Sequence, residues 1–240
     1  METETVNCCQ GANGADEVYE SCLGETGERI GRCDYGEPGI LRPEATTVMK
    51  SWMDRLVATG MTRAFLKPGD SAPNFTLTNT DGRQRRLSEM LRRGPVLLMF
   101  YHGYWCPHCH RQLSAIEEQA DEIRKAGVAI LAVSPQTPDY SLATREAAGL
   151  TFDILSDVGN QVAHKFGVAV RLSAPVETLF ESLNIYLSQY NGDDSNELPV
   201  PVIYVIESEG KIRCVLAASE FTGLIKVERI IQVLSNTPDR

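Results

Sequence analysis

The chain has 240 residues, of which 42% are apolar and 23% are charged, a composition typical of globular proteins that fold in water. Its net charge of −9 repels phosphate backbones, so we expect no nucleic-acid partner. No apolar run reaches the roughly 20 residues that a membrane helix needs, so we expect no membrane partner. The first residues show no basic stretch followed by an apolar one, and a cytoplasmic location is the default expectation.

Residues 1–42 are rich in glycine and acidic residues and show only weak apolar periodicity. Residues 1–50 hold ten acidic and four basic side chains, so they carry −6 of the net charge of −9. Such a segment buries little apolar surface, and we predict a flexible acidic extension over residues 1–42. It contains Cys8, Cys9, Cys22 and Cys33. The spacing of these cysteines matches no zinc-binding pattern, and their role stays open.

Residues 43–66 are predicted to form an N-terminal helix that precedes the main domain. Val48, Trp52 and Leu56 recur at helical spacing, and Gly60 suits a helix end. We expect the apolar side of this helix to pack on the main domain, with Trp52 as a packing residue.

The main domain is predicted over residues 67–236, and it opens with a hairpin between residues 75 and 87 that turns at Asp81-Gly82. Apolar strands follow at 96–101, 128–133 and 202–206, and a last strand at 211–216. Helical patterns lie at 107–125, 138–148, 158–166, 175–189 and 224–235. Because uninterrupted apolar strands are buried on both faces, this alternation predicts an α/β fold. We expect a three-layer sandwich with a central mixed β-sheet flanked by helices.

The residues from Trp105 to His110 read Trp-Cys-Pro-His-Cys-His, and they carry the chemistry of the sequence. Cys106 follows a buried strand and comes just before a helix, where unpaired backbone N–H groups stabilise a thiolate. We therefore expect a lowered pKa and a nucleophilic sulfur at Cys106. Pro107 is tolerated in the first helical turn, and His108 supplies a proton or a hydrogen-bond donor beside the sulfur.

Cys109 lies one helical turn beyond Cys106, close enough for a disulfide after modest rearrangement. The stripe that begins at these two cysteines continues through Leu113, Ile116, Ala120 and Ile123. This stripe is the core-facing side of the helix, so Cys106 lies at its exposed tip and Cys109 deeper. The arrangement favours an attacking thiolate at Cys106 and a shielded resolving thiol at Cys109.

Three alternatives compete with a redox-active pair. The residues from Cys106 to His110 also match the C-x-x-C-H pattern of c-type haem attachment, but nothing else in the chain indicates a haem pocket. A zinc site is a second alternative, because the segment is dense in possible ligands, namely His102, Cys106, His108, Cys109 and His110. Zinc cages usually draw on two separated ligand pairs, however, and the second pair is missing. Two buried cysteines without chemistry are the third, which the neighbouring Trp105 and Pro107 disfavour.

Several ordered blocks between residues 67 and 235 resemble the AhpC/TSA peroxiredoxin-like proteins of the thioredoxin superfamily, in particular the branch that carries a CxxC pair. The blocks are Lys67–Phe75, Phe100–Cys109, Phe152–Asp157 and Leu198–Ile206. The resemblance implies a thioredoxin-like fold and an antioxidant enzyme that reduces peroxides through Cys106, with Cys109 as the resolving cysteine. A thioredoxin-like protein or a small thiol would then reduce the pair, and no cofactor or metal is expected.

The resemblance is incomplete at the residues that handle peroxide. Where peroxiredoxins place a proline, a threonine and an arginine, this sequence has Met99, Gly103 and Pro201, and His102 stands where the CxxC branch commonly has arginine. A thiol–disulfide oxidoreductase with little peroxidase activity is therefore the alternative function. Pro201 fits the cis-proline that faces the CxxC loop in thioredoxins, and we expect a cis peptide bond there. The missing donors also predict slow peroxide reduction and comparatively fast disulfide exchange.

Overall fold

The computed structural model describes residues 43–217 and 225–235. The predicted flexible extension and its four cysteines lie outside the described residues, so the division of the chain into three segments stays a prediction. Among the described helices, none is long and apolar enough to cross a membrane.

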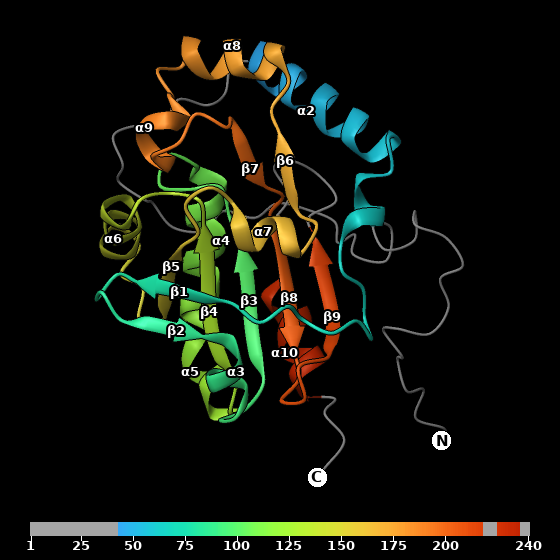
Figure 1. Ribbon diagram of the computed structural model, residues 1–240, viewed down its shortest axis with the longest axis vertical. Helices are drawn as coiled ribbons and strands as arrows, with labels where there is room; N and C mark the ends of the chain where they lie inside the picture. The colour runs from blue at the N-terminus through green and yellow to red at the C-terminus, as the bar shows by residue number, and fades with distance from the viewer. Residues whose placement is uncertain (1–42, 218–224, 236–240) are drawn as a thin grey trace.

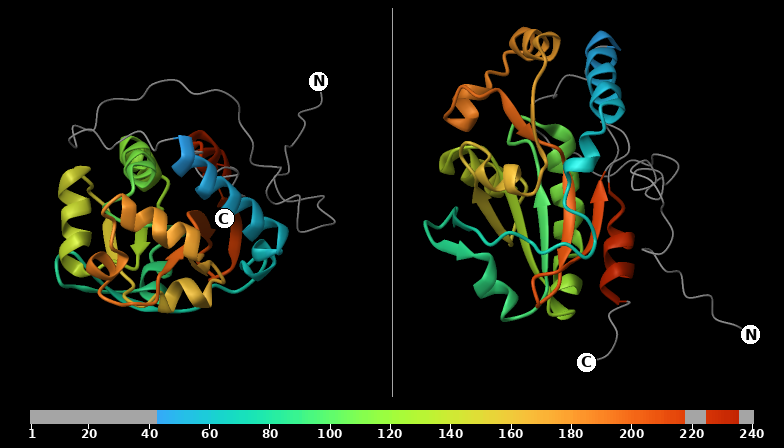
Figure 2. Two further views of the ribbon diagram at one scale, coloured as in Figure 1. Left: turned by 90° about the horizontal axis from the view of Figure 1, so that it is seen from above. Right: turned by 45° about the vertical axis from the view of Figure 1, so that its right-hand side comes forward.

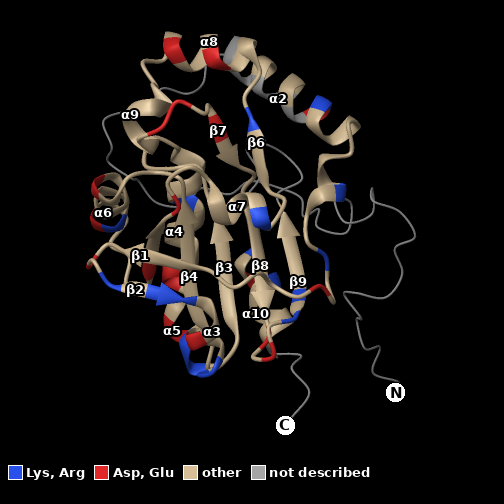
Figure 3. Ribbon diagram, viewed as in Figure 1, with Lys and Arg blue, Asp and Glu red and all other residues tan. Residues whose placement is uncertain are grey.

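A seven-stranded mixed sheet forms the centre of the molecule, with strand order β2-β1-β5-β4-β3-β8-β9 (Figure 1). Its strands are β1 (Thr76–Asn79), β2 (Gln84–Arg86), β3 (Val96–Phe100), β4 (Ala129–Ser134), β5 (Asp153–Ser156), β8 (Val202–Ile206) and β9 (Ile212–Ala217). Strand β3 runs parallel to β4 and antiparallel to β8. These central strands carry no charged side chain, whereas β2 at the edge is strongly basic (Figure 3). The predicted mixed sheet and its hairpin, β1–β2, are therefore confirmed.

Alternate residues of β3 point to opposite faces of the sheet, and each face has its own core. Leu97 and Met99 pack in one apolar cluster, and Leu98 and Phe100 pack in the other. The first face is covered by α4 (Pro107–Glu118), α5 (Ala120–Lys125) and α10 (Val227–Ser235), and the second by α3 (Leu87–Leu91) and α7 (Gln161–Lys165). Figure 2 shows α4 and α10 on one side of the sheet and α7 on the other. The expected three-layer sandwich is confirmed, with α6 (Pro138–Ala147) packed beside β5.

A second group of elements lies beyond the end of the sheet where β3 leads into α4 (Figure 1). It consists of α2 (Pro43–Ala58), η1 (Met61–Ala64), the two-stranded sheet of β6 (Ala169–Arg171) and β7 (Glu197–Pro199), α8 (Ala174–Ser182) and α9 (Leu187–Asn191). Helices α2 and α8 contact each other, and we call these two helices the cover. Trp52 of α2 is buried in one cluster with Val176 and Phe180 of α8, which confirms that it is a packing residue.

Asp157 shows how the block Phe152–Asp157 stabilises the fold. Its carboxylate accepts hydrogen bonds from the backbone N–H groups of Val162 and Ala163, each with a shortest distance of 2.9 Å. These donors belong to the first turn of α7, where backbone N–H groups have no partner within the helix. Burial nevertheless raises the pKa of Asp157 to about 6, because the carboxylate has lost its contact with water.

Candidate functional site: a buried cysteine pair

Cys106 is the N-cap residue of α4, as the sequence predicts. Its backbone is extended, and its Sγ accepts the backbone N–H of Cys109 at 3.2 Å. Pro107 follows as the first helical residue, where its missing N–H costs no hydrogen bond. The sulfur therefore takes the position that the oxygen of Ser or Asp occupies in most helix caps.

Cys109 lies one turn deeper, and its Sγ accepts the backbone N–H of His102 at 3.4 Å. Leu113 and Ile116 continue its side of the helix into the core, which confirms the predicted stripe. A side-chain nitrogen of His102 and the two sulfurs all lie within 4.8 Å of one another. Both thiols are free, and both cysteines are only 3% exposed. The expectation that Cys106 lies at an exposed tip is therefore wrong, because the surrounding residues bury both cysteines equally.

The protonation of the pair differs from the sequence prediction. Burial raises the pKa of Cys106 well above its ordinary value, and a hydrogen bond with Cys109 raises it further. Burial opposes a thiolate at Cys109 as well, but the hydrogen bond with Cys106 and the nearby His102 together hold its pKa well below the ordinary value. The expectation of a lowered pKa at Cys106 is wrong for this conformation, because the helix start stabilises its thiolate less than burial destabilises it. In this conformation a thiolate is favoured at Cys109 over Cys106.

Trp105 packs against the apolar cluster that contains both cysteines. The indole of Trp105 stacks on the imidazole of His102, with ring centroids 5.6 Å apart and an angle of 5° between the planes. Trp105 also contacts Phe180 of the cover, at a centroid distance of 5.0 Å. Phe180 of the cover therefore packs against Trp105, and Trp105 stacks on His102, which lies next to the two sulfurs.

The loop between β3 and α4 is shaped by a glutamine that the sequence analysis missed. Gln136 is fully buried, and its Oε1 accepts the backbone N–H of Tyr104 at 2.7 Å. Gly103 has φ +153°, and a Cβ atom there would lie 2.9 Å from Gln136 Oε1 and 3.2 Å from Trp105 Nε1. A threonine side chain has no room at this position. No motif marked Gln136, because it follows β4, far from the cysteines in sequence.

The remaining predicted site residues lie around this centre in different ways. His108 contacts Arg111 through Nδ1, and its pKa is lowered by burial and by the Arg111 charge. His110 is buried, and its Nε2 lies 2.7 Å from the backbone oxygen of Tyr104, so this ring also holds the loop. Of the three histidines in the motif region, His102 is the one that the structure groups with both sulfurs.

The expected cis bond before Pro201 is wrong, because every peptide bond among the described residues is trans. The segment stays extended between β7 and β8, since Val200 N–H donates to the backbone oxygen of Val168 at 2.8 Å. Val202 then pairs with Phe100, so Pro201 precedes β8 next to the end of β3 that leads to the reactive loop.

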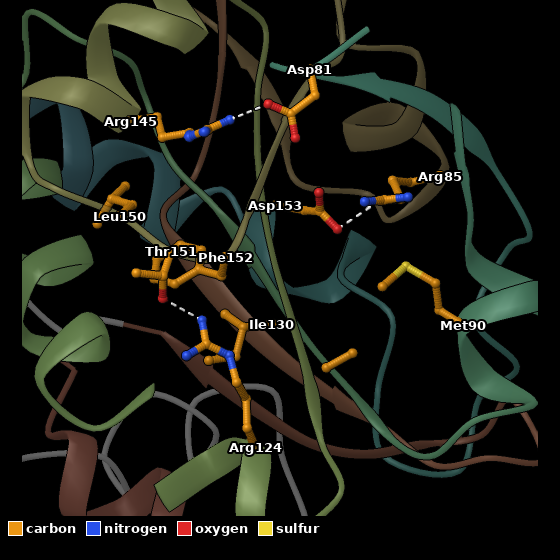
Figure 4. A pocket seen from close by; sticks show the side chains of 11 residues that line it. Asp81, Arg85, Met90, Arg124, Ile130, Arg145, Leu150, Thr151, Phe152 and Asp153 are labelled. Carbon is orange, nitrogen blue, oxygen red and sulfur yellow. Dashed lines mark hydrogen bonds and ion pairs between the residues drawn. The ribbon is translucent and has the colours of Figure 1, made fainter. Parts of the chain in front are cut away.

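A pocket of about 400 Å³ lies beside the β1–β2 hairpin, and no residue of the cysteine loop lines it (Figure 4). Three arginines face it, and each has a partner. Arg85 pairs with Asp153 at 2.7 Å, Arg145 pairs with Asp81 at 2.5 Å, and Arg124 donates to a threonine hydroxyl. The ion pairs join the hairpin to α6 and β5, and we assign no chemistry to this pocket.

Comparison with known proteins places these observations in context. The family model described as AhpC/TSA family matches residues 68–215, which is more than half of the chain. Peroxiredoxin Bcp of Escherichia coli (strain K12) is 38% identical over 103 residues, which cover 43% of this chain and 65% of Bcp. The match therefore spans slightly less than two thirds of that relative. The thiol-disulfide oxidoreductase ResA of Geobacillus thermodenitrificans is 28% identical over 169 residues, 70% of this chain and 76% of ResA.

Solved structures show the same fold. Peroxidoxin BcpB from Mycobacterium tuberculosis aligns with a TM-score of 0.59 at 22% identity, over 72% of this chain and 99% of BcpB. A yeast mitochondrial 1-Cys peroxiredoxin aligns with a TM-score of 0.54 at 17% identity, over 71% of this chain and 76% of its own. The predicted thioredoxin-like fold is thereby confirmed.

Proposed function

The chain belongs to the AhpC/TSA family, and on that premise we propose that it is a thiol-dependent peroxidase in which Cys106 attacks and Cys109 resolves. The observation that carries the proposal is the position of the two sulfurs at the start of α4. Cys106 Sγ caps the helix, Cys109 Sγ lies within 4.8 Å of it, and each sulfur accepts a hydrogen bond from a backbone N–H group. A disulfide needs about 2.05 Å between the sulfurs, so a modest movement of one side chain closes it.

The proposed reaction has three steps. The Cys106 thiol first passes its proton to the Cys109 thiolate, and the Cys106 thiolate then attacks the near oxygen of a hydroperoxide. The O–O bond breaks, the leaving oxygen takes the proton back from Cys109, and a sulfenic acid and an alcohol (or water) form. The Cys109 thiolate then attacks the sulfenic sulfur, so that the Cys106–Cys109 disulfide forms and hydroxide leaves, which takes a proton from the solvent to give water. Two thiol equivalents from a thioredoxin-like protein or a small thiol reduce the disulfide and are themselves oxidised. A reducing compartment such as the cytoplasm fits this cycle, because it returns the pair to the dithiol form.

Disulfide exchange through the same pair is the second candidate. The similarity to ResA supports it, since that match covers more of this chain than the match to Bcp does. The absence of side-chain donors at Met99, Gly103 and Pro201 supports it as well. A well-placed donor typically contributes roughly 100- to 1000-fold to the rate of a step that develops charge on oxygen.

A stopped-flow comparison decides between the two functions. Reduced protein is mixed with hydrogen peroxide or with a small disulfide, and the loss of thiol is followed at several oxidant concentrations. The peroxidase proposal expects a saturable or second-order reaction with peroxide that disappears in Cys106→Ser. Cys214→Ala is the matched control, because Cys214 is a buried thiol in β9 outside the pair. Turnover of the disulfide alone would replace the proposal with the second candidate.

A further inference from the structure

We propose that the reduced site is also a binding site for one thiophilic divalent cation, Zn²⁺, held by His102, Cys106 and Cys109. The cation would keep both thiols from reacting with oxidant, so the site would be inhibited by zinc while it is reduced. The inhibition rests on the proposed function, whereas the binding requires only the free thiols and the histidine.

The geometry of the three groups is close to that of a zinc site. Zn–S bonds of about 2.3 Å and Zn–N bonds of about 2.05 Å place tetrahedral ligand atoms roughly 3.5–3.8 Å apart. The two sulfurs and a nitrogen of His102 lie within 4.8 Å of one another before any cation binds. The ligand atoms therefore need to approach by at most about 1.3 Å, which side-chain rotation supplies.

The surroundings of the ligands favour a bound cation. Backbone N–H groups donate to both sulfurs, from Cys109 to Cys106 Sγ at 3.2 Å and from His102 to Cys109 Sγ at 3.4 Å. Such donors orient thiolates and balance their charge in metal sites. The stacking of Trp105 on His102 fixes the plane of the imidazole. All three ligand residues are buried, with exposures of 3% for each cysteine and 5% for His102, so water competes weakly for the ligand positions.

The donor set selects the kind of cation. Two thiolates and an imidazole suit zinc, whereas magnesium and calcium require oxygen ligands. Three protein ligands leave the fourth tetrahedral position for water, as in zinc sites that stay open. When Zn²⁺ binds, each thiol that is still protonated releases its proton, and nothing is oxidised or reduced. A disulfide offers no thiolate, so oxidation of the pair removes two of the three ligands and releases the cation.

The sequence analysis expected no metal because it found only one pair of cysteines. His102, one of the possible ligands in the sequence, supplies the third ligand from the start of the loop that joins β3 to α4. His102 and Cys106 lie before the first residue of α4, so helical periodicity did not show which of the nearby histidines lies beside the sulfurs. The fold of the loop creates the triad.

The test uses the full-length chain with Cys8, Cys9, Cys22 and Cys33 replaced by serine, so that other thiols do not bind the probe. Reduced protein competes with a chromophoric chelator for Zn²⁺, and the bound equivalents and the affinity are measured. We expect one equivalent in the reduced protein, none after oxidation of the pair, and none in Cys106→Ser. His102→Asn should weaken the affinity by at least about 10-fold, whereas Cys214→Ala should leave it unchanged.

Co²⁺ in place of Zn²⁺ provides a spectroscopic signature of the ligands. A tetrahedral site with two sulfurs gives intense visible bands and a sulfur-to-metal charge-transfer band, and His102→Asn should change the visible bands. Equal affinity and an identical spectrum in His102→Asn would overturn the proposal, as would zinc binding that persists in the oxidised protein. Because these measurements contain no peroxide, they fail or succeed independently of the peroxidase assay.

Discussion

Replacing Gly103 by threonine restores the residue that peroxiredoxins place three positions before the attacking cysteine, yet we expect it to damage the site. A β-branched residue at φ +153° is strained by roughly 1–3 kcal/mol. Its Cβ would lie 2.9 Å from Gln136 Oε1, so Gln136 must move and the Tyr104 N–H loses its acceptor. That loss costs about 1–3 kcal/mol more. The free energy of unfolding should therefore fall by about 2–6 kcal/mol, which lowers the melting temperature by roughly 4–24 °C.

Urea unfolding measures this loss, and Gly69→Thr is the matched control. Gly69 also has a positive φ, +93°, but a Cβ atom there meets nothing within 4 Å. The control isolates backbone strain, so Gly103→Thr should be the more destabilised of the two by the cost of displacing Gln136. The peroxide reaction of Gly103→Thr should also be no faster than that of the natural chain. A stable Gly103→Thr protein with faster peroxide reduction would refute the reasoning from the crowded loop.

Three further results are expected. Cys109→Ser should accumulate a sulfenic acid on Cys106 after one equivalent of peroxide, detectable as a dimedone adduct by mass spectrometry; rapid turnover without such an adduct would exclude Cys109 as the resolving thiol. Burial raises the pKa of Asp157 from 3.8 to about 6, so the folded state holds this proton more tightly than the unfolded chain does. The free energy of unfolding should therefore fall by roughly 3 kcal/mol as the pH rises from about 4 to about 6. Asp157→Asn should remove this pH dependence from urea-unfolding measurements. Phe180→Ala, which thins the cover, should speed the reaction of Cys106 with a small disulfide more than its reaction with hydrogen peroxide in stopped-flow experiments.

Much of the fold could be predicted because it depends on local patterns. The uninterrupted apolar runs became β3, β4 and β8, and the stripe that includes Leu113 and Ile116 became the buried side of α4. The predicted helix over 107–125 is interrupted at Gln119, which the pattern did not indicate. The short strands β5, β6 and β7 were also missed, because three or four residues are too few to establish a period.

The centre of the candidate site was predictable, but its surroundings were not. Cys106 and Cys109 follow from one short motif, whereas the contact with Gln136 joins residues that are 32 positions apart in sequence. The pKa values depend on burial, and burial depends on the cover, which is built from segments before and after the motif. The trans bond at Pro201 likewise follows from the pairing of the preceding segment rather than from the proline itself.

The burial of Cys106 and the absence of side-chain donors act at different stages of the reaction, and the two reagents separate them. Exchange with a disulfide needs three sulfurs nearly in line, so the incoming molecule and its substituents must pass Trp105 and Phe180. Hydrogen peroxide needs little more room than water, but charge develops on its leaving oxygen and requires fixed donors. In the closed structure, with Cys106 only 3% exposed, disulfide exchange is therefore limited by access and peroxide reduction by the chemical step. Replacing Phe180 by alanine removes part of the cover, so it should improve access for a disulfide without changing the chemical step of peroxide reduction. Equal acceleration of both reactions in Phe180→Ala would mean that access limits both, and the argument from missing donors would then lose its support.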